Sequence, residues 1–455
     1  MQTKHGILTA EGVLYIQGNQ WHTMPVGREN SLLAFIEDLG DLFRIADEAG
    51  LTHLWVPEID GMPEPDTNFA ENNYPGKVIL NYADSGPYEG LLKSAHRFGT
   101  TEVRPLAIIF PEHTRWVECW DGLPADKELL VTISYMEQAL GVPMAGSPST
   151  MGWKLLEKMH PDWIKNFPKV RLENAHFTAE AASDLVAFIG RIEVGQYIHK
   201  VDRNSAYLSS CATEFYGVGD PVIDTDGSKY KEGSIKDEHR PGVWYCQIIP
   251  GDIVLPQWRE SGTYWLAHPI IRLMRAVGYE VDVLNGWYFP ECHQTMRKWA
   301  NFLWDARMSF QTDKAKWRRD VPRELARQGI KMIAVSTVGL TAYTGFDANE
   351  ESSKRRPDIR LQTVARTYEL VYHNMMKFHE LIGLMPIMVY TDALYYVTKD
   401  ATMALFDPLL KRSDKLGGYK YEGHIEVTTE IAEVINSDIA VSEKLAALNT
   451  AGWSK

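Results

Sequence analysis

The sequence has few cysteines, no long apolar run and no excess of positive charge. Its four cysteines are scattered, with no CxxC pair and no histidine at zinc-ligand spacing, which excludes a disulfide framework and a structural zinc site. The longest apolar stretch, residues 381–390, is too short to cross a bilayer, and the N-terminus lacks a signal-peptide pattern. We therefore expect a soluble protein of the reducing cytoplasm that makes no membrane contact.

The net charge of −13 argues against nucleic-acid contact over the whole surface, because Lys and Arg supply the contacts to phosphate. Basic residues nevertheless gather in residues 314–331 and 352–360. Two solvated helix faces explain these runs as well as a phosphate-binding surface does. The charge pattern indicates only that any phosphate-binding surface lies in the second half of the chain.

Hydrophobic periodicity predicts an α/β segment up to about residue 195 and a different pattern after it. In the first segment we expect strands at 12–18 and 51–59, a hairpin at 103–122, and helices at 31–50, 127–141 and 178–190. In the second, a strand at 197–202 runs into a helix, and a hairpin at 242–256 precedes a helix–glycine–strand unit at 268–289. Long helices follow at 293–316, 319–343 and 358–382, then a strand at 386–397, and strands with a turn at 416–435.

Two of the predicted strands carry an aspartate, and the long basic helices lie between them in sequence. Metal-dependent phosphoryl transfer needs this arrangement, because carboxylates from different elements bridge two divalent ions and cations hold a polyphosphate. Asp202 and Asp392 are the candidates. Taken alone, each aspartate reads better as a turn or helix-cap residue, so order and spacing must carry the assignment.

That order resembles the motifs of the family-B DNA polymerases. "DRNSAYLSS" (202–210) resembles motif A, D-x-x-S-x-Y-P-S, and "GIKMIAVSTVG" (329–339) resembles motif B, K-x-x-x-N-S-x-Y-G. "YTDALYY" (390–396) resembles motif C, D-T-D-S-L-Y, while "AVGYEVDVLNGWYF" (276–289) and "LGGYKYEG" (416–423) resemble palm segments of the same family. The similarity covers about residues 196–425 and is greatest to the compact phage, plasmid and protein-primed members.

The resemblance implies an α+β right-hand polymerase fold, with a palm and helical fingers, preceded by an α/β N-terminal domain. A degenerate exonuclease stays an open reading of that domain, where Glu58 and Asp60 follow a plausible strand but read as loop acids. We therefore expect no proofreading. The implied domains are the N-terminal domain at 1–195, the palm at 196–310 and 351–425, the fingers at 311–350, and a short thumb or tail at 426–455.

The resemblance also implies roles at the nucleotide. Asp202 and Asp392 would hold Mg²⁺ or Mn²⁺, with the backbone carbonyl of Arg203 as a further ligand. Ser205 would lie where the turn backbone meets the triphosphate. Tyr207 would pack beneath the sugar and exclude a 2′-hydroxyl, and a core aromatic is the equal alternative for it.

A set of cations would meet phosphate groups, if the resemblance extends to them. Lys331 would contact the triphosphate, assisted by Arg307, Arg319 and Arg327. Arg327 lies one helical turn before Lys331 and shares its face, whereas Arg319 lies about 120° away from it on a helix. Lys420 is a candidate for the primer-strand phosphate, and a helix-surface ion pair is the alternative for Arg307.

Three positions depart from the family pattern. Tyr390 replaces the first carboxylate of motif C, which removes negative charge and should weaken metal affinity or change metal preference. Val335 and Val338 replace the asparagine and tyrosine of motif B, which affects nucleotide and template positioning. Synthesis that is slow, favoured by manganese or absent would follow from these changes.

Three functions stay open at this point. The first is a DNA-directed DNA polymerase without proofreading, which transfers dNTPs by a two-metal reaction onto a primer 3′-hydroxyl or a priming hydroxyl. Its partners would be primer-template DNA, dNTPs and a priming or processivity protein. The second is a polymerase-derived nucleic-acid-binding protein without synthesis, such as a telomere- or replication-associated factor, and the third is a nuclease or an unrelated α/β enzyme.

Overall fold

The computed structural model describes the chain outside residues 1–3, 10, 18–19, 26–44, 47, 56–77, 83–91, 98–103, 110–114, 121, 123, 146, 166–185, 189–190, 231–240, 254, 256, 312–319, 343–355, 412 and 455. The chain divides into two compact units. Unit 1 comprises residues 1–155, 305–337 and 345–350, and unit 2 comprises residues 156–304, 338–344 and 351–455. The expected loop acids Glu58 and Asp60 and most of the helix expected at 31–50 lie outside the described residues.

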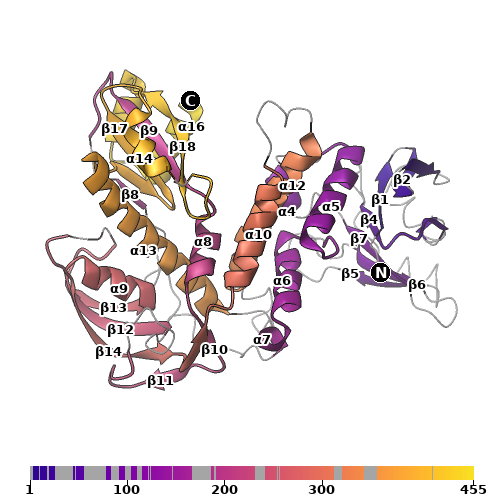
Figure 1. Cartoon of the computed structure of the whole chain (residues 1–455), viewed down its shortest axis with the longest axis horizontal. Helices are drawn as coiled ribbons and strands as arrows, with labels where there is room; N and C mark the ends of the chain where they lie inside the picture. Colours follow the sequence, from indigo (N-terminus) through magenta and orange to yellow (C-terminus); the bar gives the residue numbers. More distant parts are fainter. Residues whose placement is uncertain are drawn as a thin grey trace. The chain divides into compact units, whose positions relative to one another are not determined.

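Unit 1 contains a mixed sheet with the strand order β3-β2-β1-β4-β7-β6-β5 (Figure 1). Strand β1 pairs in parallel with β4, and β4 with β7, whereas the other neighbours are antiparallel. The predicted strands at 12–18 and 51–59 are confirmed as β2 and as the short strand β4. The strands are β1 (His5–Thr9), β2 (Gly12–Gln17), β3 (Gln20–Met24), β4 (His53–Trp55), β5 (Val78–Tyr82), β6 (Leu92–Arg97) and β7 (Arg104–Ile109).

The helices of unit 1 pack through buried apolar side chains. Helix α5 (Asp126–Leu140) matches the predicted helix and ends at Gly141, whose φ of 62° suits glycine. The predicted hairpin at 103–122 is wrong, because strand β7 is followed by helix α4 (Arg115–Trp120). Trp116 and Trp120 lie one turn apart on α4 and are both buried, and Trp120 donates a hydrogen bond to the carbonyl of Leu325 at 3.1 Å.

Unit 2 is organised around an antiparallel sheet with the order β18-β9-β17-β16-β8 (Figure 1). The predicted strand at 197–202 is confirmed as β9. The stretch 386–397 is a hairpin rather than a single strand, with residues 391 and 392 at its turn. The strands are β8 (Val186–Phe188), β9 (Tyr197–Arg203), β16 (Met388–Tyr390), β17 (Ala393–Thr398) and β18 (Tyr419–Glu426).

This sheet is covered on both faces. On one face, Val201, Leu394 and Tyr396 join a large buried cluster with apolar residues of α9 (His268–Ala276) and α13 (Pro357–Ile382). On the other, Ile198 and Tyr395 pack with α15 (Thr429–Asn436) and α16 (Val441–Ala451). Because strand side chains alternate between faces, neighbouring residues of β9 enter different cores.

A second antiparallel sheet of unit 2 shares the large cluster through Val243, Trp244 and Cys246. Its order is β11-β14-β12-β13, and the predicted helix–glycine–strand unit is confirmed as α9, Gly278 and β14. Its strands are β11 (Val222–Asp224), β12 (Gly242–Ile249), β13 (Gly262–Ala267) and β14 (Glu280–Tyr288). Strand β10 (Tyr216–Val218) pairs separately with β15 (Glu291–His293).

Three further expectations need correction. The stretch 186–188 is strand β8, not helix, because it pairs with β16 at the edge of the sheet and this contact overrides its helical composition. Strand β12 pairs with β13 and with β14, so the hairpin expected at 242–256 is wrong. After β18 the chain forms helix α15, whose N-cap hydroxyl on Thr428 accepts from the amide of Ile431 at 3.3 Å.

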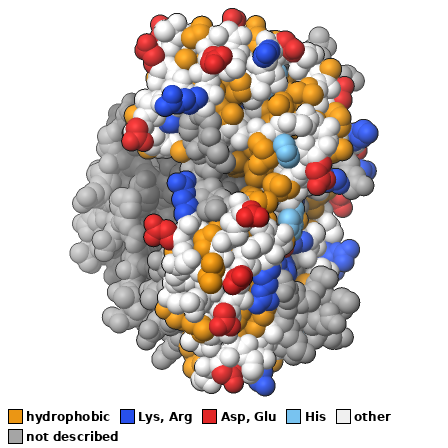
Figure 2. Space-filling view, turned by 90° about the vertical axis from the view of Figure 1, so that its left-hand side faces the viewer, with side chains coloured by type: hydrophobic (Ala, Val, Ile, Leu, Met, Phe, Trp, Pro, Cys, Tyr) orange, Lys and Arg blue, Asp and Glu red, His pale blue; other side chains and the backbone are white. Residues whose placement is uncertain are grey.

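The remaining helices include the long ones that the sequence predicts. They are α6 (Pro148–Met159), α7 (Pro161–Lys165), α8 (Ala206–Thr213), α10 (Arg297–Ser309), α12 (Val321–Leu340) and α14 (Asp407–Leu410), with the 3₁₀ turn η4 (Ala404–Phe406). In the described part of the chain, no helix combines the length and apolar character needed to cross a membrane. Figure 2 shows acidic and basic side chains interspersed on the described surface of one face, with apolar side chains between them.

Candidate active site

The two aspartates predicted from the motifs lie next to each other in the sheet of unit 2. Asp202 is the penultimate residue of β9 and stands opposite Ala393, the first residue of β17. Asp392 directly precedes Ala393, at the turn of the β16–β17 hairpin. Directly opposed residues of an antiparallel pair have Cβ atoms about 5 Å apart, so the backbone register brings both carboxylates to one end of the sheet.

The turn that carries Asp392 has a strained backbone. Tyr390 pairs with Ala393, which leaves Thr391 and Asp392 as a two-residue turn. Thr391 has φ of 52°, a left-handed value that is costly for a β-branched residue. Its hydroxyl donates to Oδ1 of Asp392 at 3.0 Å, which orients the carboxylate.

The loop after Asp202 has the same property. Ser205 has φ of 50° and immediately precedes helix α8. Among the described residues, Ser205 and Thr391 are the two non-glycine positions with positive φ. Strained backbone of this kind gathers at functional sites, where the surrounding structure holds it in place. Its occurrence in these two loops supports a functional reading of both aspartates.

Arg203 is a buried cation behind the aspartates. Its side chain is only 4% exposed, with Nε donating to the carbonyl of Gly417 at 3.1 Å and a terminal nitrogen donating to Oγ of Ser209 at 2.7 Å. Burial lowers the pKa of Arg203, while Tyr419 and Asp392 oppose part of that shift. The backbone N–H of Asn204 also donates to the carbonyl of Gly418, in the loop before β18. The motif A loop is thereby tied to the segment 413–418.

Lys420 lies directly on the first aspartate. It stands opposite Asp202 in the β9–β18 pair, and its Nζ is 3.0 Å from Oδ2 of Asp202 and also bonds Oε1 of Glu422. Burial lowers the pKa of Lys420, but the Asp202 carboxylate and Glu422 outweigh this and raise the pKa. The ammonium is therefore held between two carboxylates.

The charges of both aspartates raise the pKa of two nearby tyrosines. The pKa of Tyr395 is raised first by burial and then by the charges of Asp202 and Asp392. Burial also raises the pKa of Tyr419, and Arg203 opposes this while both carboxylates add to it. These shared effects place the two carboxylates in one electrostatic neighbourhood, with Asp202 half-buried at its side chain and accessible to a cation.

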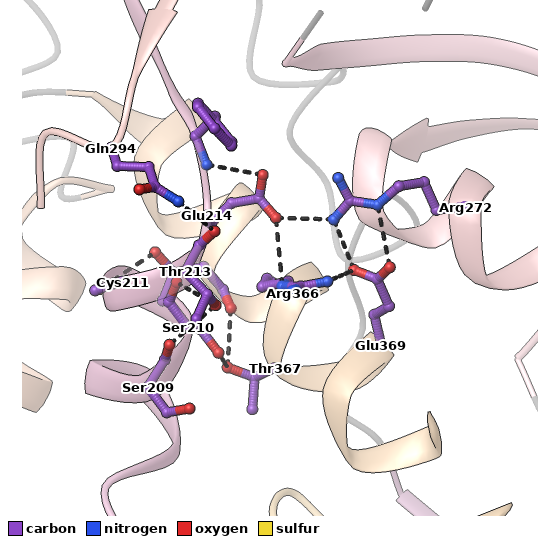
Figure 3. A network of polar contacts seen from close by, with 12 residues as sticks. Ser209, Ser210, Cys211, Thr213, Glu214, Arg272, Gln294, Arg366, Thr367 and Glu369 are labelled. Carbon is purple, nitrogen blue, oxygen red and sulfur yellow. Dashed lines mark hydrogen bonds and ion pairs between the residues drawn. The ribbon is translucent and has the colours of Figure 1, made fainter. Parts of the chain in front are cut away.

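Helix α8 is anchored below the site by a polar network (Figure 3). Ser210 of α8 bonds the hydroxyl of Thr367 on α13 at 2.7 Å. Glu214, just after α8, pairs with Arg272 of α9 at 2.9 Å, and Arg272 pairs in turn with Glu369 of α13 at 2.7 Å. Three helices are therefore locked together beneath the loop that follows Asp202.

Two further motif positions of unit 2, Tyr207 and Tyr390, are half-buried. Tyr207 lies in the first turn of α8, and Tyr390 is the last residue of β16, where it pairs with Val186 as well as Ala393. Strand β16 lies between β17 and β8, and the side chain of Tyr390 packs against the cluster that contains Ile198 and Tyr395.

The predicted phosphate contacts from the basic helices belong to unit 1. Lys331 is exposed on α12, and Val335, at 40% exposure, follows it one turn later, whereas Ser336 and Val338 are buried. Arg327 is held by Glu324, with Nε 2.7 Å from Oε2. Arg307 is half-buried near the end of α10, and Arg319 lies outside the described residues.

Sequence reasoning missed Glu422 and the pairing of Lys420. Register shifts between Tyr421 and Gly423, so Glu422 sits at a β-bulge. The local signal for this was Gly423, whose φ of 146° suits a glycine in an irregular strand. Only the pairing of β18 with β9 shows that Lys420, which bonds Glu422 on its own strand, also lies against Asp202.

The oxygen donors of this site fit a hard divalent cation. Two carboxylates and a backbone carbonyl are ligands that Mg²⁺ and Mn²⁺ accept, with water completing the shell. Over the described ranges, no cluster of three or more His, Cys, Asp and Glu side chains is arranged to hold a metal ion. Asp202 and Asp392 by themselves therefore offer few protein oxygens to a cation.

No protein-family model matches this sequence, and no curated protein matches it either. Solved structures of phi29 DNA polymerase are similar in fold. The complex with primer-template DNA and incoming nucleotides has a TM-score of 0.56 at 11% identity, covering 94% of this chain and 85% of the polymerase. The binary complex with primer-template DNA gives 0.54 at 12% identity, with 93% and 85% covered. At such identities the likeness concerns the fold alone, so this chain is a mixed α+β protein with a fold similar to that of phi29 DNA polymerase.

Proposed function

We propose that this protein is a DNA-polymerase-like nucleotidyltransferase without proofreading. The observation that carries the proposal is the placement of Asp202 near the end of β9 and of Asp392 in the turn before the neighbouring strand β17, in a fold similar to that of phi29 DNA polymerase. In the proposed layout, the sheet of β9, β17 and β18 is the palm, the basic helices contribute to the fingers, and the N-terminal sheet belongs to a separate α/β domain. The substrate would be primer-template DNA with dNTPs, and a priming or processivity protein would assist.

The proposed chemistry depends on a divalent cation, Mg²⁺ or Mn²⁺, held by Asp202, Asp392 and the backbone carbonyl of Arg203. When bound, the ion would lower the barrier to attack of a hydroxyl on the α-phosphate by neutralising developing charge. The resemblance implies two such ions, and the carboxylates present suffice for the first. Arg203 fixes the backbone that bears the carbonyl, since its guanidinium is bonded to Gly417 and Ser209.

Helix α8 would receive the phosphates. Its first turn contains no acidic residue, and a helix N-terminus favours anions through unpaired N–H groups and the helix dipole. Ser205 would align the triphosphate by its backbone, and Tyr207, in that same turn, would exclude the 2′-hydroxyl. On the strength of the motif alone, we propose four phosphate contacts from unit 1: Lys331, Arg307, Arg319 and Arg327.

Primer extension tests this proposal. The full-length protein should add dNTPs to a labelled primer-template with Mn²⁺ or Mg²⁺, and Asp392→Ala should abolish incorporation while DNA binding persists. Asp414→Ala, an exposed aspartate paired with Lys415, is the matched control and should extend normally. Retained synthesis in Asp392→Ala would remove the metal-ligand assignment. Tyr207→Val should raise ribonucleotide incorporation, and an unchanged sugar preference would make Tyr207 structural.

A second candidate function is binding of DNA without synthesis. The pairing of Lys420 with Asp202 and the loss of a carboxylate at Tyr390 favour it, because both reduce the negative charge that draws metal ions to the site. In that case neither metal would support incorporation, while DNA binding would weaken steeply as salt rises.

A further inference from the structure

The ion pair between Lys420 and Asp202 puts a protein cation where a metal cation would bind. Nζ lies 3.0 Å from Oδ2 of Asp202, and direct opposition in the β9–β18 ladder fixes the two side chains on one face. The side chains of Lys420 and Asp202 are 38% and 23% exposed, so solvent ions can reach the pair. A divalent ion that uses this oxygen must therefore compete with the ammonium.

Glu422 helps to hold the Lys420 ammonium at this position. The β-bulge between Tyr421 and Gly423 brings the Glu422 carboxylate to Nζ, where it bonds the same ammonium as Asp202 does. Because one ammonium bonds both carboxylates, Glu422 positions Lys420 beside Asp202.

A second protein cation lies on the opposite face of β9. Arg203 is buried and its position is fixed by Gly417 and Ser209, so it is not free to move away from the site. Asp202, Asp392 and Glu422 contribute three negative formal charges to the site. Lys420 and Arg203 contribute two positive ones, so the net formal charge is −1. Two divalent ions would add four positive charges, and a net charge of −1 does not neutralise them.

We propose that the Lys420 ammonium takes the place of one divalent cation, so that the site binds a single Mg²⁺ or Mn²⁺ while Lys420 stays on Asp202. This inference rests on the proposed function in that it takes Asp202 and Asp392 as the metal carboxylates. Lys420 is here a residue that sets the number of bound ions, and Glu422 is the residue that positions it.

Mn²⁺ titration of the full-length protein tests the proposal without any turnover. Electron paramagnetic resonance measures free Mn²⁺, and subtracting it from the total gives the number of bound ions. The wild type should show one site that is lost in Asp392→Asn. Lys420→Met should gain a second site, or bind the first about tenfold or more tightly, because a like charge within about 4 Å is removed. Lys420→Arg should behave as the wild type does.

The matched control is Lys415→Met, which removes the same charge from an exposed lysine paired with Asp414. Circular dichroism checks folding, and Lys420→Gln replaces the methionine variant if that one does not fold. Two Mn²⁺ sites in the wild type that both depend on Asp392, unchanged binding in both Lys420 variants, or no binding in any variant would each overturn the proposal. Primer extension reports on the proposed function separately, so a failed ion count with successful extension would remove this inference alone.

Discussion

Replacing Arg272 with methionine should destabilise unit 2 by about 3–5 kcal/mol, the range for removing one partner of a buried ion pair. Arg272 is bidentate to Glu369, with distances of 3.0 and 2.7 Å, and bonds Glu214 at 2.9 Å (Figure 3). The two glutamate side chains are 1% and 4% exposed. Burial lowers the pKa of Arg272, but the two carboxylates outweigh it and raise the pKa, so the guanidinium stays charged.

The cost arises because each glutamate would lose its ion pair with Arg272. Arg366 bonds Glu369 at 2.6 Å and lies 3.7 Å from Glu214. One positive charge would then face two buried negative charges. The double variant Arg272→Met/Glu369→Gln should recover part of the loss, since it removes one uncompensated carboxylate.

Urea unfolding followed by circular dichroism measures this change. Arg360→Met is the matched control, because Arg360 is exposed on the same helix as Glu369 and should change stability by less than about 0.5 kcal/mol. A loss below about 1 kcal/mol for Arg272→Met would refute the reasoning, because it would mean that the glutamates are not buried against this arginine. The single variant should also slow nucleotide incorporation, since α8 is anchored through Glu214.

Three further perturbations have definite expected outcomes. Thr391→Gly should stabilise the fold by about 0.5–1 kcal/mol and so raise the melting temperature slightly, because glycine adopts the positive φ without strain. A melting temperature below that of the wild type would show that the hydroxyl bond to Asp392 contributes more than the strain costs. Gly417→Ala should destabilise more than Gly383→Ala in urea titrations: their φ values are 74° and 73°, but only at Gly417 would a Cβ meet Ser209, at 2.3 Å from Oγ. Burial, with His5 assisting, lowers the pKa of His53 to about 4, so the unfolded chain binds the proton first as pH falls from 6.5. Unit 1 should therefore lose up to about 3 kcal/mol between pH 6.5 and 4, and His53→Gln should abolish that slope in thermal melts.

Local features of the fold follow from the sequence. Helix α5 with its terminal Gly141, the unit of α9, Gly278 and β14, and the long helix α13 were all predicted, because periodicity and glycine punctuation act over a few residues. The strand β9 leading into α8 was predicted for the same reason. The predicted mixed α+β class is confirmed in these terms.

Predictions failed where pairing between distant segments decided the structure. Residues 186–188 are a strand through their contact with β16, about 200 residues away in the chain. The stretch 386–397 reads as one strand locally, but the pairing of Tyr390 with Ala393 makes it a hairpin. Propensity carries no information about either contact, since each depends on a partner elsewhere.

The site divides in the same way. The sequence alone predicted Asp202 and Asp392 as metal ligands by their place in two ordered motifs, together with the departure at Tyr390. Only the tertiary structure decided that Lys420 pairs with Asp202, because β-sheet register is set by pairing between distant segments. The identity of the acids is therefore a property of the sequence, and the cation that balances them is a property of the fold.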